Sequence, residues 1–288
     1  MDMNNADRAQ VLVEALPYIQ KYYGKVVVVK YGGNAMINDE LKHDVMRDMV
    51  LLSLIGVRMV LVHGGGPEIS AMLKRVGKAS RFVDGLRVTD EETSEIVQMI
   101  LAGKINKSLV AKLDFLGGRA MGICGMDGGL IEAKMKDERL GYVGDIVSID
   151  PQPILDLLDK GYIPVVSTLG CDKSGHVYNI NADTAAAEIA AALHAETLVS
   201  MTDTPGLLRD PADPTSLIRR LTVDQAERLK DEGIISGGMI PKIECVCRAI
   251  REGVRKVFII DGRVPHALLI ELLTDEGAGT LFKKEFTK

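Results

Sequence analysis

The sequence has no tryptophan, and aromatic residues of all kinds make up only 4% of its 288 residues. It also lacks any apolar run near the roughly 18 residues that a membrane-spanning helix needs. Its first ten residues are polar and include acidic side chains, without the apolar stretch of a secretory signal. We therefore expect a cytoplasmic protein with no membrane partner.

Cysteine is scarce as well, and basic residues do not outnumber acidic ones. The four cysteines, Cys124, Cys171, Cys245 and Cys247, are scattered, so their spacing indicates neither a disulfide framework nor a zinc site. We expect them to be small packing residues, and we predict no metal site. The 35 basic and 40 acidic residues give a net charge of −5, which argues against a nucleic-acid partner.

Two familiar phosphate-binding motifs are missing too, because neither G-x-x-x-x-G-K-[ST] nor G-x-G-x-x-G occurs. A P-loop enzyme and a Rossmann oxidoreductase are thereby disfavoured. What remains is ordinary for a globular chain, with 47% hydrophobic and 26% charged residues. The length suits one large α/β domain or two lobes that share a cleft.

Strand and helix patterns alternate along the chain. Residues 25–29, four of them valine, predict a first strand buried on both faces, and glycine turns then lead into helices. This rhythm is typical of a mainly parallel sheet. We expect a three-layer αβα fold whose central sheet is shared by two lobes, residues 25–178 and 179–288. Residues 1–24 precede them, with an amphipathic helix over 6–22 that Pro17 kinks.

A long helix is predicted over residues 90–116, with Thr89 or Asp90 as its N-cap. Apolar residues lie on two of its flanks. Because one flank is enough for packing on its own sheet, we expect the other to form a subunit interface.

The first glycine turn follows the valine strand. Lys30 lies at the carboxyl end of that strand, where open α/β sheets place ligands. Gly32 and Gly33 allow backbone N–H groups to approach a phosphate closely. A tight turn with a solvent-facing lysine is the simpler alternative.

The second glycine turn, residues 63–67, reads HGGGP and again follows a buried strand. Two such turns on neighbouring strands could face each other across one ligand. His63 itself is more often a hydrogen-bonded structural residue than a catalyst.

Three charged residues further along are candidates for anion binding. Arg87 could hold a carboxylate with two parallel hydrogen bonds, although a surface arginine is the simpler interpretation. Asp183 follows the segment NINA and could cap a helix or orient lysines. Lys242, in the segment SGGMIPK, falls in the first turn of a helix, where a cation is unfavourable unless an anion lies near.

Taken together, the segments KYGGNAM, HGGGPEI, GLRVTD, NINADTAA, TDTPGLL and SGGMIPK resemble the amino-acid kinase superfamily, and within it the acetylglutamate kinase family. The order and spacing of the set are specific, and the resemblance covers nearly the whole chain. It implies ATP-dependent phosphorylation of the γ-carboxylate of N-acetyl-L-glutamate, an early step of arginine biosynthesis.

The resemblance also implies roles for individual residues. Lys30 and Lys242 would neutralise charge on the transferring phosphoryl group, with Asp183 holding both, while Gly32, Gly33 and Gly65 would donate backbone N–H groups. Acetylglutamate would bind in the lobe 25–178 and ATP in the lobe 179–288, with Mg²⁺ carried by the phosphates. The acetylglutamate ligands would be Gly64, Gly65, Arg87 and Asn179, and the nucleotide ligands Thr202, Asp203, Gly206 and Leu207.

The residues before Lys25, together with KYGGNAM and with TDEGAGT near the C-terminus, resemble the arginine-inhibited branch of that family. In this branch the N-terminal helices join dimers into a hexamer, and arginine binds beside that helix and the C-terminal segment. The helix could instead pack on its own subunit. Two other functions remain open, a kinase for glutamate, aspartate or carbamate, and a non-catalytic amino-acid sensor.

Overall fold

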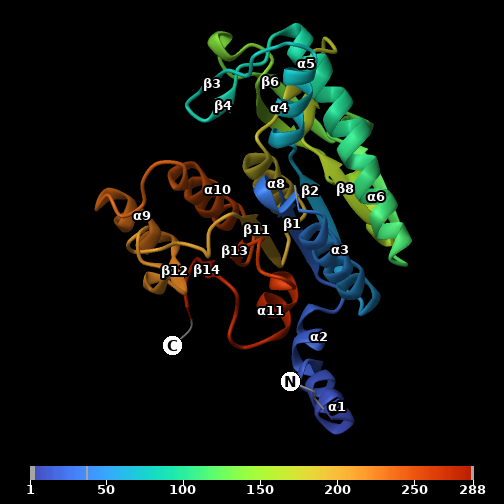
Figure 1. Cartoon of the computed structure of the whole chain (residues 1–288), viewed down its shortest axis with the longest axis vertical. Coiled ribbons are helices and arrows are strands. Elements are labelled where there is room, and N and C mark those ends of the chain that lie inside the picture. Colours follow the sequence, from blue (N-terminus) through green and yellow to red (C-terminus); the bar gives the residue numbers. More distant parts are fainter. Residues whose placement is uncertain (1–3, 37, 287–288) are drawn as a thin grey trace.

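The computed structural model describes residues 4–36 and 38–286 of the chain. An eight-stranded sheet runs through the whole molecule, in the strand order β12-β14-β13-β11-β1-β2-β8-β5 (Figure 1). Its strands are β12 (Arg220–Thr222), β14 (Thr280–Lys283), β13 (Val257–Asp261), β11 (Thr197–Thr202), β1 (Val26–Tyr31), β2 (Arg58–His63), β8 (Ile163–Ser167) and β5 (Ala120–Cys124). All neighbouring pairs are parallel except β13 with β14. The mainly parallel sheet expected from the sequence is confirmed.

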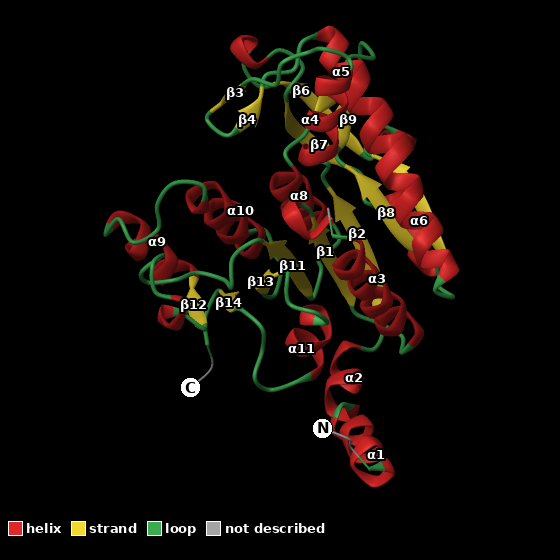
Figure 2. Cartoon of the chain, viewed as in Figure 1, coloured by secondary structure: helices red, strands yellow, loops and turns green. Residues whose placement is uncertain are grey.

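Helices cover both faces of this sheet, which gives three layers (Figure 2). Alternate residues of β1 point to opposite faces, so Val28 joins one hydrophobic core and Val27 and Val29 join the other. Helices that contribute to the Val28 core are α7 (Gln152–Asp159), α8 (Ala182–Ala192), α9 (Val223–Asp231) and α10 (Met239–Arg251). The second core includes residues of α2 (Leu16–Tyr22), α3 (Asp39–Leu54), α4 (Gly66–Arg75), α5 (Glu91–Gln98), α6 (Asn106–Phe115) and α11 (Ala267–Leu273).

Smaller sheets lie beyond the carboxyl edge of the large one. A four-stranded sheet has the order β10-β9-β6-β7. Its strands are β10 (Val177–Asn179), β9 (Leu169–Cys171), β6 (Ile131–Met135) and β7 (Gly144–Ile149). A short hairpin, β3 (Phe82–Val83) with β4 (Leu86–Arg87), lies near it at the top of the view in Figure 1. This hairpin carries Arg87 to the edge where the parallel strands end.

The long helix predicted over residues 90–116 is one continuous rod but not one regular α-helix. Asp90 caps α5, with its side chain accepting a hydrogen bond from Thr93 N, and a π-helical segment, Met99–Ile105, separates α5 from α6. Apolar periodicity extends through the π segment, so the sequence pattern did not reveal it.

The N-terminal segment forms two helices, α1 (Asn5–Glu14) and α2, with the break at Ala15. Pro17 lies at the start of α2, where its missing N–H costs nothing, so the predicted kink occurs two residues earlier than the proline. In Figure 1, α1 projects away from the rest of the chain, and it has no buried residue.

The predicted lobe boundary near residue 178 falls inside β10, and both proposed lobes contribute strands to the large sheet. The division into lobes 25–178 and 179–288 is therefore a prediction based on which ligand each part is expected to bind. Within the described residues, no helix is both long and apolar enough to cross a membrane. Cys124 and Cys247 are buried, and all four cysteines are free thiols.

Candidate active site

The carboxyl ends of six parallel strands, β5, β8, β2, β1, β11 and β13, lie at one edge of the sheet. Lys30 is next to the last residue of β1, His63 ends β2, and Thr202 ends β11. Strand register pairs Lys30 with Val62 on one side and with Ser200 on the other. Residues far apart in sequence therefore lie side by side along the carboxyl edge of the sheet. This is the edge at which the position of Lys30 led us to expect a ligand.

Asp183 joins the two candidate lysines. The Nζ of Lys30 lies 2.9 Å from Oδ1 of Asp183, and the Nζ of Lys242 lies 2.7 Å from Oδ2. Lys30 is 6% exposed, so its ammonium is largely removed from solvent. One carboxylate thus holds two cations from β1 and α10 in a fixed arrangement, which leaves one net positive charge at this point.

Burial of Asp183 raises its pKa, but attraction by Lys30 and then Lys242 outweighs burial and lowers the pKa to about 2. The carboxylate therefore remains ionised throughout the neutral pH range. It is a permanent anchor for the two ammonium groups.

Asp183 is not the N-cap of α8, contrary to the expectation from sequence. The cap is Asn181, whose Oδ1 accepts hydrogen bonds from the backbone N–H of Asp183 at 3.0 Å and of Thr184 at 3.1 Å. Asp183 lies inside the first turn instead. Its carboxylate is consequently free of the capping role and can bind the lysines.

Arg87 is nearly buried and has no carboxylate partner within the described residues. Its guanidinium donates to Ser80 Oγ at 2.7 Å, to Ser70 Oγ at 2.8 Å and to the Gly66 carbonyl at 3.0 Å. The ring of Phe82 lies 4.7 Å from Cζ. Burial lowers the pKa of Arg87, as expected for a cation that only neutral groups surround. Such an arginine is suited to an anionic ligand.

A pocket of about 260 Å³ brings together the residues predicted to bind acetylglutamate. Both glycine turns, the β3–β4 hairpin and the segment from β10 to α8 line it. Its polar and glycine lining includes Gly32, Gly33, Gly64, Gly65, Arg87, Thr168, Asn179 and Asn181. Phe82, Leu86, Leu101 and Val143 form apolar parts of the wall. We call this cavity the acceptor pocket.

Gly65 lies in close contact with the neighbouring helix, so a side chain at this position would force its neighbours to move. A Cβ atom at Gly65 would lie 2.3 Å from Cδ1 of Ile105 and 2.7 Å from Cδ2 of Leu101. Both neighbours belong to the π-helical segment. The turn is thus packed directly against that segment.

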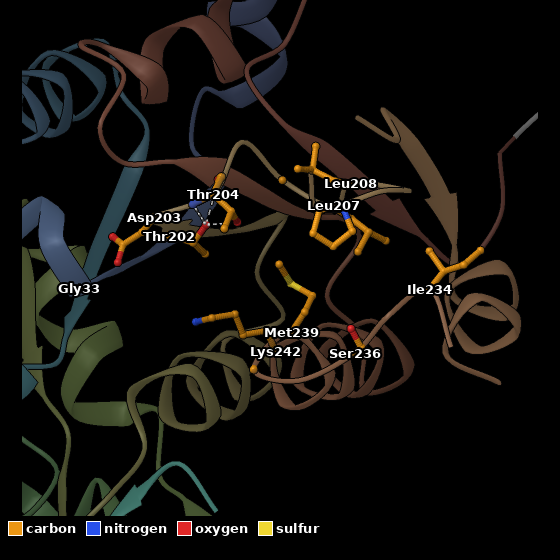
Figure 3. Close-up of a pocket in the computed structure, with 13 residues that line it drawn as sticks. Gly33, Thr202, Asp203, Thr204, Leu207, Leu208, Ile234, Ser236, Met239 and Lys242 are labelled. Atoms are coloured by element: carbon orange, nitrogen blue, oxygen red, sulfur yellow. Dashed lines mark hydrogen bonds between the residues drawn. The ribbon is translucent and has the colours of Figure 1, made fainter. Parts of the chain in front are cut away.

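A larger pocket of about 560 Å³ lies between the end of β11 and the start of α10 (Figure 3). The four predicted nucleotide residues, Thr202, Asp203, Gly206 and Leu207, all line it. Met239 and Lys242 project into it from α10, opposite Thr202 and Asp203. We call it the nucleotide pocket.

The two pockets meet at Gly33, which lines both. Lys242 belongs to the nucleotide pocket, while Asn181 and Ala182, directly before Asp183, belong to the acceptor pocket. The lysine–aspartate–lysine cluster therefore lies at the junction, where a group could pass from one ligand to the other.

Sequence reasoning missed several residues that support or line the two pockets. Phe82, Ser70 and Ser80 support Arg87 through contacts that no local motif reveals. Ile234, Met239 and Leu208 supply apolar surface in the nucleotide pocket and had no sequence signal beyond hydrophobicity. Asn181 could have been found, because Asn directly before a helix is a strong capping signal.

Within the described residues, no group of three or more His, Cys, Asp or Glu side chains could hold a metal ion. Asp183 is engaged by two lysines. The protein itself therefore offers no enclosed metal cage in this part of the chain.

The chain resembles known proteins over almost its full length. The model of the amino acid kinase family matches residues 25–261. The acetylglutamate kinase of Brachyspira hyodysenteriae is 54% identical over 286 residues, which cover 99% of each chain. That of Heliobacterium modesticaldum is 53% identical over 290 residues, covering 96% of this chain and 98% of its own.

Solved structures agree on the fold. An N-acetylglutamate synthase from Neisseria gonorrhoeae, complexed with coenzyme A and N-acetyl-glutamate, has a TM-score of 0.85 and 28% identity. The match covers 97% of this chain but 64% of the synthase, so the chain spans less than two thirds of that protein. Carbamate kinase from Giardia lamblia bound to AMP-PNP has a TM-score of 0.68 at 17% identity, which supports the fold alone. The chain is a kinase that belongs to the amino acid kinase family and groups within it with the acetylglutamate kinases.

Proposed function

We propose that the chain transfers the γ-phosphoryl group of ATP to the γ-carboxylate of N-acetyl-L-glutamate, an early step of arginine biosynthesis. The observation that carries this proposal is the Lys30–Asp183–Lys242 cluster at the junction of two pockets. Relatives named acetylglutamate kinase at about 54% identity support the choice of acceptor.

The chemistry needs positive charge more than it needs a base. A carboxylate is already ionised at neutral pH, so no general base is required to activate it. Attack brings it toward a phosphorus surrounded by negative oxygens, and an ammonium about 4 Å from a developing charge contributes up to ~4 kcal/mol at an effective dielectric constant of ~20. Lys30 and Lys242 supply that charge, while Gly32, Gly33 and Gly65 supply backbone N–H groups.

Acetylglutamate carries a second carboxylate, on its α-carbon. Arg87 is the buried cation without an acidic partner in the acceptor pocket, so we assign it to this group. Gly64 and Asn179 line the same pocket and would hold the remaining polar atoms. The γ-carboxylate then faces the lysine cluster.

ATP occupies the nucleotide pocket in this proposal. Leu207 and Met239 supply apolar contacts for the base, and Thr202, Asp203 and Gly206 complete the binding residues. Mg²⁺ accompanies ATP and is held chiefly by its phosphates, since the described residues contain no cluster of metal ligands. The ion supplies further neutralisation of phosphate charge.

An acceptor panel tests this function. Purified enzyme with Mg²⁺-ATP is assayed for ADP release with N-acetyl-L-glutamate, L-glutamate, L-aspartate or carbamate. We expect turnover with acetylglutamate and at least 100-fold lower kcat/KM with the others, because glutamate keeps a charged amine that the apolar wall cannot hydrate. Comparable or better turnover with glutamate, aspartate or carbamate would refute the assignment, and a complete lack of turnover would favour a sensor.

We further propose that arginine inhibits the enzyme at a separate pocket. This cavity, about 190 Å³, lies between α2 and the segment from α11 to β14 and includes Tyr18, Lys21, Glu271, Asp275 and Glu276. Burial raises the pKa of Glu271, although hydrogen bonds from the N–H groups of Ala278 and Gly279 oppose it. Three carboxyl groups suit a guanidinium, which supports the resemblance to the arginine-inhibited branch.

The N-terminal helix supports a proposed homo-oligomer, a hexamer with the dimer as its unit. Val11, Leu12 and Val13 of α1 and Leu16 at the start of α2 are at least half exposed, so this part of the segment packs poorly on its own subunit. Two exposed residues of the long rod, Met99 and Phe115, add apolar surface for the dimer contact. The enzyme would act in the cytoplasm, where ATP and acetylglutamate are available.

A further inference from the structure

His63 and Asn106 form a fully buried pair behind the glycine turn of the acceptor pocket, and neither of them lines that pocket. Asn106 is the first residue of α6, directly after the π-helical segment, and His63 ends β2. Buried polar side chains are costly unless their hydrogen bonds are made, so the pattern of those bonds indicates their purpose.

The orientation of the Asn106 amide is fixed by its neighbours. Its Nδ2 lies 2.8 Å from the Val165 carbonyl and 3.2 Å from the Ile123 carbonyl. Carbonyl oxygens only accept hydrogen bonds, so the amide nitrogen, and not the oxygen, must face them. The same Nδ2 lies 3.3 Å from Nε2 of His63 and shares its hydrogens among the three acceptors.

The tautomer of His63 follows from this orientation. Since Asn106 donates, Nε2 of His63 accepts and carries no proton. The proton is therefore on Nδ1, which lies 2.9 Å from the Gly64 carbonyl and donates to it. Burial lowers the pKa of His63 to about 4, so the ring stays neutral near pH 7 and keeps this direction of donation.

The Gly64–Gly65 turn is thus held from two sides by the same stretch of helix. Asn106 acts on the Gly64 carbonyl through His63, and Ile105 and Leu101 pack against Gly65, where an added Cβ would displace the ends of both side chains. A π-helical turn immediately before Asn106 sets both contacts, and such turns are frequent at functional sites.

We propose that Asn106 and His63 are positioning residues that fix the Gly64 carbonyl and thereby aim the Gly65 N–H into the acceptor pocket. The inference rests on the proposed function, in which Gly65 donates to the reacting groups. Neither residue touches the substrates. They keep the Gly65 N–H in place while negative charge develops in the transition state. Loss of either residue should therefore lower kcat more than it weakens ATP binding.

Two variants of His63 separate positioning from packing. In His63→Asn the side-chain amide nitrogen can take the place of Nδ1 and still donate to Gly64. In His63→Gln the amide reaches the place of Nε2, so the bond to Gly64 is lost while the contact with Asn106 is kept. We expect kcat of the Gln variant to be about tenfold below that of the Asn variant, the worth of one hydrogen bond, with equal KM for ATP.

Nitrogen-15 NMR of the histidine rings supplies a readout that does not depend on turnover. The chain has five histidines, and the His63→Asn variant assigns the signal of His63. We expect the neutral Nδ1–H tautomer from pH 5.5 to 8 in the wild-type enzyme. Equal kcat for the two variants, or the Nε2–H tautomer, would overturn the inference, and the NMR result decides it should the Gln variant fail to fold.

The acceptor assay keeps the two proposals apart. If the wild-type enzyme uses another acceptor in place of acetylglutamate, the proposed function is wrong. The ratio of kcat between the Gln and Asn variants, measured with that acceptor, still tests the positioning role.

Discussion

At the scale of single residues, the site contains more positive charge than its own acidic groups neutralise. Asp183 neutralises one of the two lysines bound to it, so one positive charge remains at the junction of the pockets. Arg87 is buried among neutral groups. Both arrangements cost solvation free energy in the empty protein, and an anionic ligand recovers that cost.

Replacing Arg87 tests the proposed carboxylate clamp. We expect Arg87→Ala to raise KM for acetylglutamate by about 100-fold, the loss of a charge-assisted pair of about 2–3 kcal/mol, with little change in KM for ATP. Steady-state kinetics with each substrate varied in turn measures the effect.

Arg87→Lys is the matched control, since it keeps the charge but loses the two parallel N–H donors. It should recover only part of the affinity if the clamp is bidentate. A similar rise in both KM values for Arg87→Ala would mean that Arg87 maintains the general structure of the cleft.

At the scale of elements, the long-range contact between α11 and α3 contains an unusual pair. His266, just before α11, lies 2.6 Å through Nδ1 from Oδ1 of Asp48 in α3, and Asp48 is 1% exposed. Burial raises the pKa of Asp48 to about 6, although the hydrogen bond from His266 lowers it. In the native protein the Asp48 carboxyl group therefore stays protonated at pH values where the same group is ionised in the unfolded chain.

The pH dependence of stability follows from that difference. Between about pH 4 and pH 6 the native state binds more protons at Asp48 than the unfolded state, so this group makes the free energy of unfolding fall as pH rises. The fall is at most about 3 kcal/mol. We expect Asp48→Asn to remove it, as measured by urea unfolding at pH 4.5 and pH 7.

Asp44→Asn provides the comparison for that measurement. Asp44 lies one helical turn earlier and is 3.9 Å from Nε2 of His266, but its side chain is more exposed. This variant should retain the wild-type pH dependence. An unchanged pH dependence in Asp48→Asn would show that Asp48 does not hold the proton.

Sequence patterns predicted most elements because burial and periodicity are local. The run of valines predicted β1. Lys30 follows that run, and open α/β sheets place ligands at the carboxyl ends of their strands, so a role for Lys30 could also be predicted. The expectation that Asp183 caps α8 was wrong, because the cap is Asn181, two residues earlier. The π-helical turn and the support of Arg87 by Phe82, Ser70 and Ser80 depend on tertiary contacts and left no local signal.

At the scale of the whole molecule, the N-terminal helix is the part least explained by one chain. Helix α1 has no buried residue and exposes Leu12 to 74%. Tyr22 of α2, in contrast, is buried and lies under the ammonium of Lys256, 4.5 Å from its ring centroid. The segment is therefore anchored at one end and exposed at the other, as an arm that joins subunits would be.

Deletion of residues 1–22 tests the proposed assembly and its regulation together. The arm and part of the 190 Å³ pocket are removed, while the lysine cluster is left intact. We expect a smaller oligomer by light scattering, nearly normal kcat without arginine, and no inhibition by arginine.

A single substitution separates the effect on assembly from the effect on inhibition by arginine. Leu12→Glu places a charge on the exposed face of α1 without touching the pocket, and it should reduce the oligomer by itself. If the truncated enzyme keeps both its size and its response to arginine, the arm has neither role.

The account as a whole depends on the two lysines that Asp183 holds, and the kcat of Lys30→Met against that of Lys256→Met tests this most directly. Lys256 is equally buried and also faces a carboxylate, Glu196, but it precedes β13 at the opposite edge of the sheet. We predict that Lys30→Met lowers kcat about 100-fold or more, in line with loss of a preorganised charge, while Lys256→Met changes it less than about threefold. A Lys30→Met enzyme with near-normal kcat would contradict the account.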